Sequence, residues 1–383
     1  AGDLAEAAPH FVRPGFARIE DLRDVVAQRL GQKPVGGRTL GLGLRGLAFD
    51  QRAELGPLHQ ALRVGGASEI GVEVEQDGKL RRIGARLGVL NNGGGFSQNQ
   101  PMRDKYQPGT SVEWTATPGG NTGEMILEMM KLGAAIGQME EMVGNQISLA
   151  PGTENDLVKP VVQGLTAAPH AILVDQSGVR YMNESGSYMA YCKGMLDRNK
   201  EVPSLPSWAI MDTQYLKKYM LANTMPGTKK PAKWTEEGYL HKADTIEGLA
   251  TSIKVDPTAL KTTVDRFNSF VAAGKDEDFH RGERAYDQWL GDRYHDNPSL
   301  GSISEGPFYA VHVLPGDVGT YGGVVTDPNA RVLREDGTPI EGLYATGIST
   351  ASVMGRSYPG AGASVGPSFV WGYVTAKHVL EQA

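Results

Sequence analysis

The stretch EGLYATGISTASVMGRSYPGAGASVGPSFVWGYVTAK, residues 341–377, decides how the fold is interpreted. Its residues 342–347 are a short apolar segment that ends in glycine, which predicts a strand. A loop rich in Gly, Ser and Pro follows. From Ser364 or Val365 onward the residues suit a helix, with Ser364 as its cap and Pro367 in its first turn. A helix that begins after a glycine-rich loop presents free backbone N–H groups and a partial positive charge, so we expect an electron-rich group to bind here.

The composition excludes several classes of protein. Of the 383 residues, 50 are glycine, 40% are hydrophobic, and the formal net charge is −6. This is typical of soluble α/β proteins with two or three domains, and it lacks the basic character of nucleic-acid-binding proteins. Cys192 is the single cysteine and the eight histidines show no ligand spacing, so we expect neither disulfides nor a metal site.

No apolar run of the sequence reaches the roughly 18 residues that a membrane-spanning helix needs. The N-terminal residues also lack the basic and apolar regions of a signal peptide. We therefore expect a cytoplasmic protein without a transmembrane segment, and leave peripheral membrane association open.

Hydrophobic periodicity and turn residues predict alternating strands and helices along the whole chain. The expected strands are residues 69–75, 79–85, 87–90, 171–174, 179–182, 207–211, 308–313, 322–326 and 331–333. The expected helices lie within residues 19–30, 36–50, 124–132 and 243–273, after a cap at 183–185, and after Asp212. Residues 274–305 are charged and are expected to be a loop.

Two polar and glycine-rich segments are candidates for ligand contacts. Residues 93–95 are three consecutive glycines after a predicted strand, which lets a ligand approach the backbone, although a tight turn explains them equally well. Glu124 stands in the first turn of the next helix, where it either favours the helix dipole or binds a ribose hydroxyl. The methionines of that helix are better explained as core residues than as a sulfur site.

The order of the motifs closely resembles the FAD-dependent 3-ketosteroid Δ1-dehydrogenases, within the fumarate reductase/succinate dehydrogenase flavoprotein superfamily. The resemblance runs from about residue 35 to the C-terminus and rests on GGGF, NTGE, DQSGVRYMNES, DEDFHRG, GPFYAVHV, GGVVTD, GLYATG and RSYPGAGASVGP, in this order. The Y-P-G-x-G element at 358–362 and the tyrosine after N-E-S are similar to the steroid enzymes rather than the dicarboxylate enzymes.

This resemblance implies an oxidoreductase that forms the C1–C2 double bond in ring A of a 3-oxosteroid. Tyr358 and the backbone N–H of Gly362 would hold the C3 carbonyl and stabilise enolate character, which acidifies the C2 hydrogen. Tyr188 would take the C2 proton, and the hydride from C1 would go to N5 of the flavin. The residues that match the family's FAD contacts are Gly94, Glu124, Gly347, Ser364, Val365 and Gly366.

The resemblance also implies the family's α/β fold, in which an FAD-binding Rossmann-like domain is interrupted by a mixed α+β substrate domain. The FAD-binding domain would comprise residues 1–113 and 308–383, and the substrate domain residues 114–307. The FAD-binding domain is incomplete, because no strand–G-x-G-x-x-G–helix unit precedes it to hold the ADP half of FAD. The glycine run at 41–46 has a different spacing.

Two further departures concern single positions. Ile348 stands where the family usually has a polar residue that can bond the cofactor's ribityl chain or ribose, and asparagines at 91 and 92 stand where small or apolar residues are usual. The portion that carries the dinucleotide unit also carries, in the family, a second tyrosine that assists the base.

Three explanations for the incomplete domain follow. A second polypeptide could supply the dinucleotide unit, the sequence could be a truncated or processed piece, or the protein could be a flavin-free steroid-binding protein. We favour the second polypeptide, because a half-domain would expose parallel strand edges. The partners expected are thus a steroid, this second chain and an electron acceptor such as a quinone. A superfamily reductase for another enone or a carboxylate is the alternative enzyme.

Overall fold

The computed structural model describes residues 60–64, 70–76, 78–152 and 165–382. The helices expected within residues 19–30 and 36–50 lie outside this part of the chain. The other strands and helices predicted from the sequence can be compared with the fold from residue 60 onward.

A three-stranded antiparallel sheet begins the described part. It consists of β1 (Gln60–Val64), β2 (Ile70–Gln76) and β3 (Lys79–Ala85), with β2 in the middle. Gly78 in the turn between β2 and β3 has φ +69°, a left-handed conformation that glycine adopts without strain. The predicted strand–turn–strand unit is confirmed.

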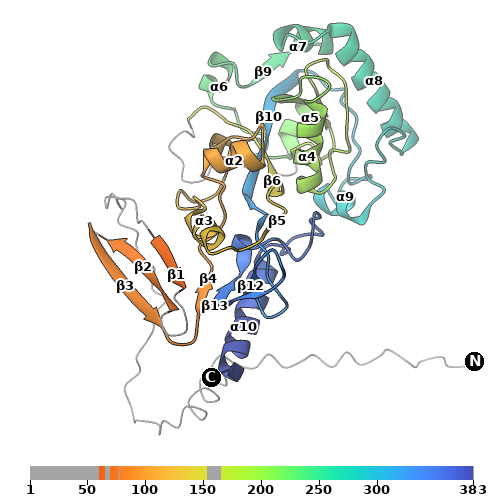
Figure 1. The fold of residues 1–383 in the computed structure, drawn as a ribbon. Coiled ribbons are helices and arrows are strands. Elements are labelled where there is room, and N and C mark those ends of the chain that lie inside the picture. The colour runs from red at the N-terminus through yellow and green to blue at the C-terminus, as the bar shows by residue number, and fades with distance from the viewer. Residues whose placement is uncertain (1–59, 65–69, 77, 153–164, 383) are drawn as a thin grey trace, which may run out of the picture. The chain divides into compact units, whose positions relative to one another are not determined.

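A second small sheet joins residues that are far apart in the sequence. It has the order β12 (Arg331–Leu333), β13 (Pro339–Ala345), β4 (Val89–Asn91), and β13 runs parallel to β4. Figure 1 shows β4 and β13 side by side although one comes early and the other late in the chain. Because the carboxyl ends of parallel strands meet at one edge, the glycine turns that follow β4 and β13 are brought to the same place.

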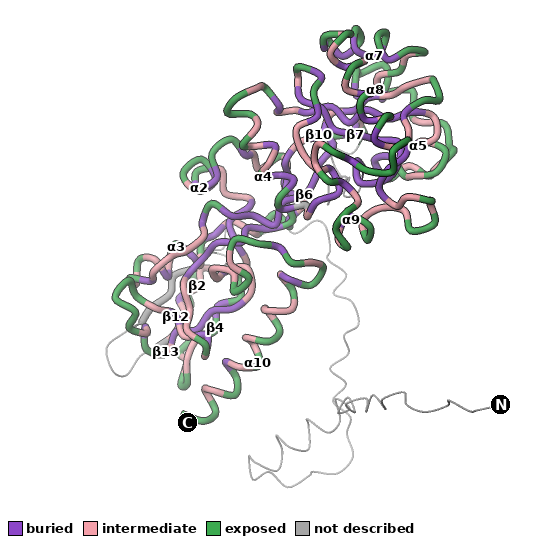
Figure 2. Tube along the Cα trace, turned by 90° about the vertical axis from the view of Figure 1, so that its right-hand side faces the viewer, coloured by how far each residue is buried: buried purple, intermediate pink, exposed green. Residues whose placement is uncertain are grey.

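The largest sheet is five-stranded and carries most of the core. Its path is β6 (Met142–Ile147), β10 (Phe308–Thr320), β8 (Ser207–Asp212), β7 (Ala171–Val174), and β9 (His241–Ala243) also pairs with β10. Its β6, β7 and β10 are buried over most of their length (Figure 2). Burial on both faces explains why β7, with the sequence AILV, is a continuous apolar run rather than an alternation.

Helices cover both faces of this sheet, and alternate strand residues point to opposite faces. Leu173 packs with α4 (Tyr188–Arg198), α5 (Thr213–Lys218) and α6 (Ala232–Glu236). Ile172 packs instead with α7 (Ile246–Ser252) and α8 (Pro257–Ala273). Two cores therefore share one sheet.

The long helix α8 shows why its sequence forms a helix at these bounds. The Asp256 side chain accepts a hydrogen bond from the Ala259 N–H at 2.7 Å, and Pro257 occupies the first turn, where its missing N–H costs nothing. Gly274, with φ +71°, ends the helix. Leu260, Val264, Phe267 and Phe270 are its buried residues, at the spacing of a helical face.

The remaining elements are short, except for an 18-residue helix near the C-terminal end. They are α2 (Gln100–Tyr106), η1 (Val112–Trp114), α3 (Glu124–Lys131), β5 (Ile136–Gly137), α9 (Ala285–Leu290), β11 (Gly323–Val324), η2 (Gly347–Ser349) and α10 (Val365–Gln382). The predicted helix at the C-terminal end is confirmed as α10, and the helix after Gly123 as α3. In the described ranges no helix combines the length and the apolar character that crossing a bilayer requires.

The structure corrects three predictions. Residues 179–182 are not a strand, because the Arg180 side chain is drawn into a buried ion cluster described below. The cap of α4 is Ser187, whose hydroxyl accepts from the Ala190 N–H, and not the 183–185 segment. The charged segment 274–305 is not all loop, since it contains α9.

The domain bounds at 113 and 307 stay predictions. β10 begins at Phe308, and the strands that pair with it, β6, β8 and β9, all lie within residues 114–307. The strand is thus part of the sheet of the predicted substrate domain, and it leads directly from that sheet into the segment that carries β13 and α10.

Candidate active site

The turns after β4 and β13 meet through specific contacts. Gly347 has φ +68°, and a Cβ atom there would lie 2.6 Å from the Asn92 Oδ1 atom, so only glycine permits this approach. The Ser349 hydroxyl donates to the Gly94 carbonyl at 2.9 Å. The structure therefore brings the predicted cofactor residues Gly94 and Gly347 into one cluster of turns.

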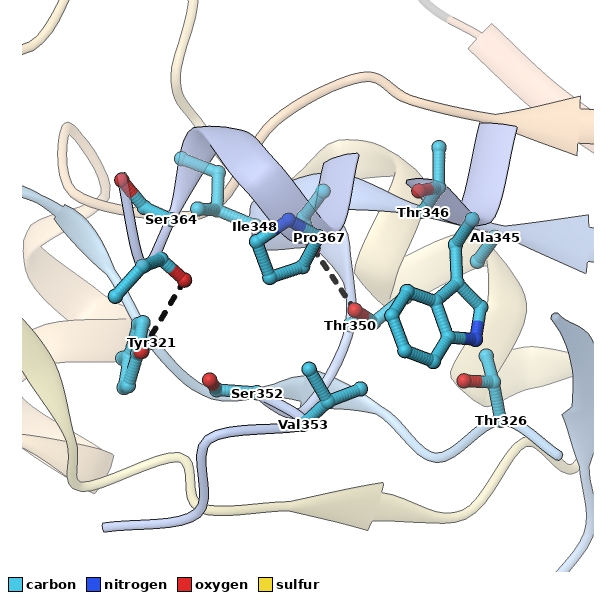
Figure 3. Close-up of a pocket in the computed structure, with 13 residues that line it drawn as sticks. Tyr321, Thr326, Ala345, Thr346, Ile348, Thr350, Ser352, Val353, Ser364 and Pro367 are labelled. Carbon is cyan, nitrogen blue, oxygen red and sulfur yellow. Dashed lines mark hydrogen bonds between the residues drawn. The ribbon is translucent and has the colours of Figure 1, made fainter. Parts of the chain in front are cut away.

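A pocket lies between η2 and the start of α10 (Figure 3). Tyr321 and Ser364 are at one end of it, and Thr326, Ala345 and Thr346 are at the other. The other lining residues are Gly347, Ile348, Thr350, Ser352, Val353, Ala363, Pro367 and Trp371. Hydroxyl groups and apolar side chains line it together, and its free space is about 20 Å³, room for roughly one water molecule.

Two predictions can be placed in this pocket. Ser364 and Gly347 both line it. Ile348 lines it as well and contributes only apolar surface. At this position the chain offers no side-chain hydrogen bond to a polar ligand.

A second pocket of about 450 Å³ lies on the other side of the loop before α10. It is lined by Met354, Pro359, Gly360, Ala361, Gly362, Ala363, Gly366, Pro367, Val370 and Trp371. A Cβ atom on Gly362 or Gly366 would meet nothing within 4 Å, so the backbone faces open space. Ala363, Pro367 and Trp371 line both pockets, so the loop before α10 and the first turns of α10 form part of each.

Tyr358 does not line either pocket but lies in a buried tyrosine cluster. The cluster consists of Val143, Met189, Tyr321, Tyr358 and Ala363, with Tyr286 packed against it. The Tyr321 and Tyr358 rings lie 6.0 Å apart between centroids. Burial raises the pKa of Tyr321, and raises that of Tyr286 to about 12, with a further contribution from Tyr358 in both cases. Tyr286 and Tyr321 are thus neutral at physiological pH and can donate hydrogen bonds.

Tyr188, the predicted base, is the first residue of α4. Its side chain lies outside what the structure describes. The next residue, Met189, belongs to the tyrosine cluster, so the start of α4 reaches the same place as the loop that carries Tyr358.

The other predicted cofactor residues are less enclosed. Val365 is the first residue of α10 and is exposed, and it lines neither pocket. Glu124 is the exposed first residue of α3, after Gly123 with φ +79°. Gly94 and Glu124 also line neither pocket. No cluster of three or more His, Cys, Asp or Glu side chains suited to a metal ion occurs in the described ranges.

Sequence reasoning missed a buried cluster of four charges. Arg180 Nη2 lies 2.7 Å from Glu184 Oε2 and 2.9 Å from Asp276 Oδ2, and Arg281 Nη1 lies 3.3 Å from Glu184 Oε2. All four residues are buried. Burial disfavours the Glu184 charge, but the two arginines outweigh this and hold its pKa below the usual range. The DEDFHRG motif supplies Asp276 and Arg281, and it was the one sequence feature that could have indicated this cluster.

A second missed contact joins the two elements that carry the predicted catalytic tyrosines. The buried Glu141 carboxylate lies 3.0 Å from Arg356 Nη1, on the Tyr358 loop, and 3.3 Å from Lys193 Nζ, on α4. The Glu141 carbonyl also accepts from the Tyr321 N–H at 2.9 Å. One residue therefore ties together the Tyr358 loop, α4 and the end of β10.

Comparison with known proteins shows the family to which this chain belongs. The FAD binding domain family matches residues 20–365. A 3-oxosteroid 1-dehydrogenase of Mycolicibacterium smegmatis is 41% identical over 80% of this chain and 54% of its own length. A 4-oxocyclohex-2-ene-1-carboxylate 5-dehydrogenase of Sinomonas cyclohexanicum is 36% identical over 79% of this chain and 52% of its own length.

Among solved structures, the 3-ketosteroid Δ1-dehydrogenase from Sterolibacterium denitrificans in complex with 1,4-androstadiene-3,17-dione is similar, with a TM-score of 0.80 and 35% identity. The match covers 85% of this chain and 59% of that structure. The chain spans about half the length of the curated relatives it matches. Its fold, its glycine turns and these matches together show that the chain belongs to the FAD binding domain family and is similar, within it, to the 3-oxosteroid 1-dehydrogenases.

Proposed function

We propose that this chain forms part of an FAD-dependent dehydrogenase that introduces the C1–C2 double bond into a 3-ketosteroid. The observation that carries the proposal is the loop 356–364, which joins the buried Tyr358 to the open backbone at Gly362 and to the start of α10. One loop could then hold the ketone, through Tyr358 and Gly362, and the flat cofactor, at the start of α10.

The residues of this chain fit the flavin end of FAD. The pocket of about 450 Å³ beside Gly362 and Gly366 offers space that larger side chains at these two positions would fill. Gly94, Gly347, Ser364, Val365 and Gly366 would hold the cofactor there, and Glu124 a hydroxyl of its ribose. When bound, FAD accepts the hydride that leaves C1.

The chain's own groups would make C2 acidic and take its proton. The Tyr358 hydroxyl and the Gly362 N–H would donate to the C3 carbonyl oxygen and stabilise the negative charge that develops on it. The Tyr188 oxygen would accept the C2 proton as the C1–H electron pair leaves. An unperturbed phenol has a pKa of about 10, so this base needs a neighbour that favours its phenolate or relays the proton.

A second polypeptide would supply the strand–glycine turn–helix unit for the ADP half of FAD, and a quinone would reoxidise the flavin. Support for a covering polypeptide comes from α10, on which Phe369, Tyr373 and Leu380 are 77%, 69% and 67% exposed. Their spacing places them on one helical face, an apolar stripe that an added α/β unit could bury. The cytoplasmic location stays a prediction.

Purification of the protein with any chain that accompanies it tests the proposal. We expect flavin absorbance, a second chain in the preparation, and oxidation of 3-ketosteroids. Tyr358→Phe or Tyr188→Phe should lower turnover by orders of magnitude, and near-wild-type turnover would exclude the assigned mechanism. Absence of flavin together with a monomeric mass would favour a flavin-free binding protein or a fragment.

The similarity to a cyclohexenone-carboxylate dehydrogenase favours a smaller cyclic keto acid as the second candidate substrate. Such an acid needs a free cation for its carboxylate. Of the cations near the Tyr358 loop, Arg356 is already paired with Glu140 and Glu141. A comparison of steroid and keto-acid turnover separates the two candidates.

A further inference from the structure

Tyr286 occupies a position in the tyrosine cluster that the proposed mechanism does not use. It lies on α9, within the segment expected to be a loop, and its ring packs against the cluster that contains Tyr358. Its hydroxyl oxygen has less than 1 Å² exposed and no hydrogen-bond partner among the described residues. Buried hydroxyls are nearly always paired, so this one points to a group that the protein chain itself does not provide.

The position of Tyr286 is fixed by its neighbour in the chain. The fully buried Asp287 carboxylate accepts from Asn183 Nδ2 at 3.0 Å and from the Gly282 N–H at 3.1 Å. The Ser299 hydroxyl donates to the Asp287 carbonyl at 3.1 Å. α9 is therefore tied to the segment just before α4, and the Tyr286 ring is held beside the start of the helix that carries Tyr188.

We propose that the Tyr286 hydroxyl donates a hydrogen bond to the oxygen on C3 of the steroid, beside the hydroxyl of Tyr358. The inference rests on the proposed function. Two phenols and the Gly362 N–H would then surround one carbonyl oxygen. Its high pKa keeps Tyr286 protonated, so it is a donor and not a second base. A site with buried donors selects substrates that carry the matching oxygen, because a substrate without it leaves those donors unpaired.

The test compares Tyr286→Phe with wild type and with Tyr294→Phe in the flavin-loaded protein. Tyr294 lies on the same segment and is 93% exposed. Its replacement by Phe is therefore a matched control, because it also removes one phenol hydroxyl. Dissociation constants are measured for a 3-ketosteroid and for the same steroid without the C3 oxygen, and thermal midpoints for all three proteins. We expect Tyr286→Phe to weaken binding of the ketone about 3- to 10-fold and to leave binding of the deoxy steroid and the thermal midpoint unchanged.

Each alternative result has a distinct meaning. Equal weakening for both steroids would show a packing role and overturn the inference. Unchanged ketone binding, or a lowered midpoint that reveals a protein partner for the hydroxyl, would also overturn it. A wild-type protein that binds and oxidises no steroid would instead overturn the proposed function, on which the inference depends.

Discussion

Replacing Glu184 by glutamine removes the central negative charge of the buried ion cluster. The carboxylate accepts from Arg180 Nε at 2.8 Å, Arg180 Nη2 at 2.7 Å, Arg281 Nη1 at 3.3 Å and the Leu173 N–H at 3.1 Å. In the variant two buried arginines share the single charge of Asp276, and at least one guanidinium N–H faces an amide instead of an oxygen.

The expected cost follows from that geometry. Removing one partner of a buried pair costs about 3–5 kcal/mol, because an uncompensated charge remains in the interior. Glutamine keeps the shape and one acceptor, so we expect the lower end, about 3 kcal/mol, which corresponds to a fall in thermal midpoint of roughly 4 °C for a chain of 383 residues. Glu283→Gln is the control: this residue is on the same segment but is exposed, and its pair with His280 should contribute under about 1 kcal/mol.

The pH dependence gives an independent check. The folded pKa of Glu184 is lowered, so its contribution is present above the unfolded value of about 4.3 and is lost as the pH falls through the folded pKa. The difference in free energy of unfolding between wild type and Glu184→Gln should therefore be full near neutral pH and shrink in acid. Denaturant unfolding from pH 3 to pH 7 measures it. A loss no larger than that of Glu283→Gln, or a difference independent of pH, would refute the reasoning.

Three further predictions concern the site and the sheet. Tyr358→Phe should lower kcat of the assembled enzyme about 10²- to 10³-fold, as measured by steady-state turnover, because one of the donors to the C3 oxygen is lost. Glu141→Gln weakens the link between the Tyr358 loop and α4, and should lower kcat more than it weakens steroid binding; equal effects on both would contradict a positioning role. Gly316→Ala places a Cβ atom 2.1 Å from the Trp114 carbonyl oxygen, so denaturation should show a loss of about 1–3 kcal/mol. Gly119→Ala, where a Cβ meets nothing within 4 Å, is its control and should be nearly neutral.

Elements that are specified by local signals could be predicted from the sequence. The turn between the strands at 69–75 and 79–85, the helix within residues 243–273 and the glycine-rich entry to α10 each depend on signals within a few residues, and each is found where expected. Residues 179–182 were predicted as a strand and are not one, and Arg180 pairs there with Asp276, almost a hundred residues later. No window of sequence contains both residues.

The same distinction applies to the site. Tyr358 and Gly362 share one short motif, so their proximity was evident from the sequence. Tyr286 and Tyr321 join them only because α9 and β10 fold back onto the loop, and nothing in a charged, weakly periodic segment indicates that one of its tyrosines is buried. Glu141 was missed for a related reason, since its two cationic partners come from different elements.

The thirteen-residue strand β10 ends directly before Tyr321. The tyrosine cluster is therefore bounded by the end of this strand and by the loop that carries Tyr358, and we expect these two segments to differ in local stability. Residues 308–313 of β10 pair with β8, residues 308–310 also pair with β9, and residues 314–320 pair with β6, so hydrogen exchange of its amides should require extensive unfolding. Residues 353–362 are mostly exposed and include glycines 355, 360 and 362 at positive φ, so their amides should exchange through local opening. The loop that carries Tyr358 and Gly362 is therefore the side of the cluster that we expect to open first, while β10 stays folded.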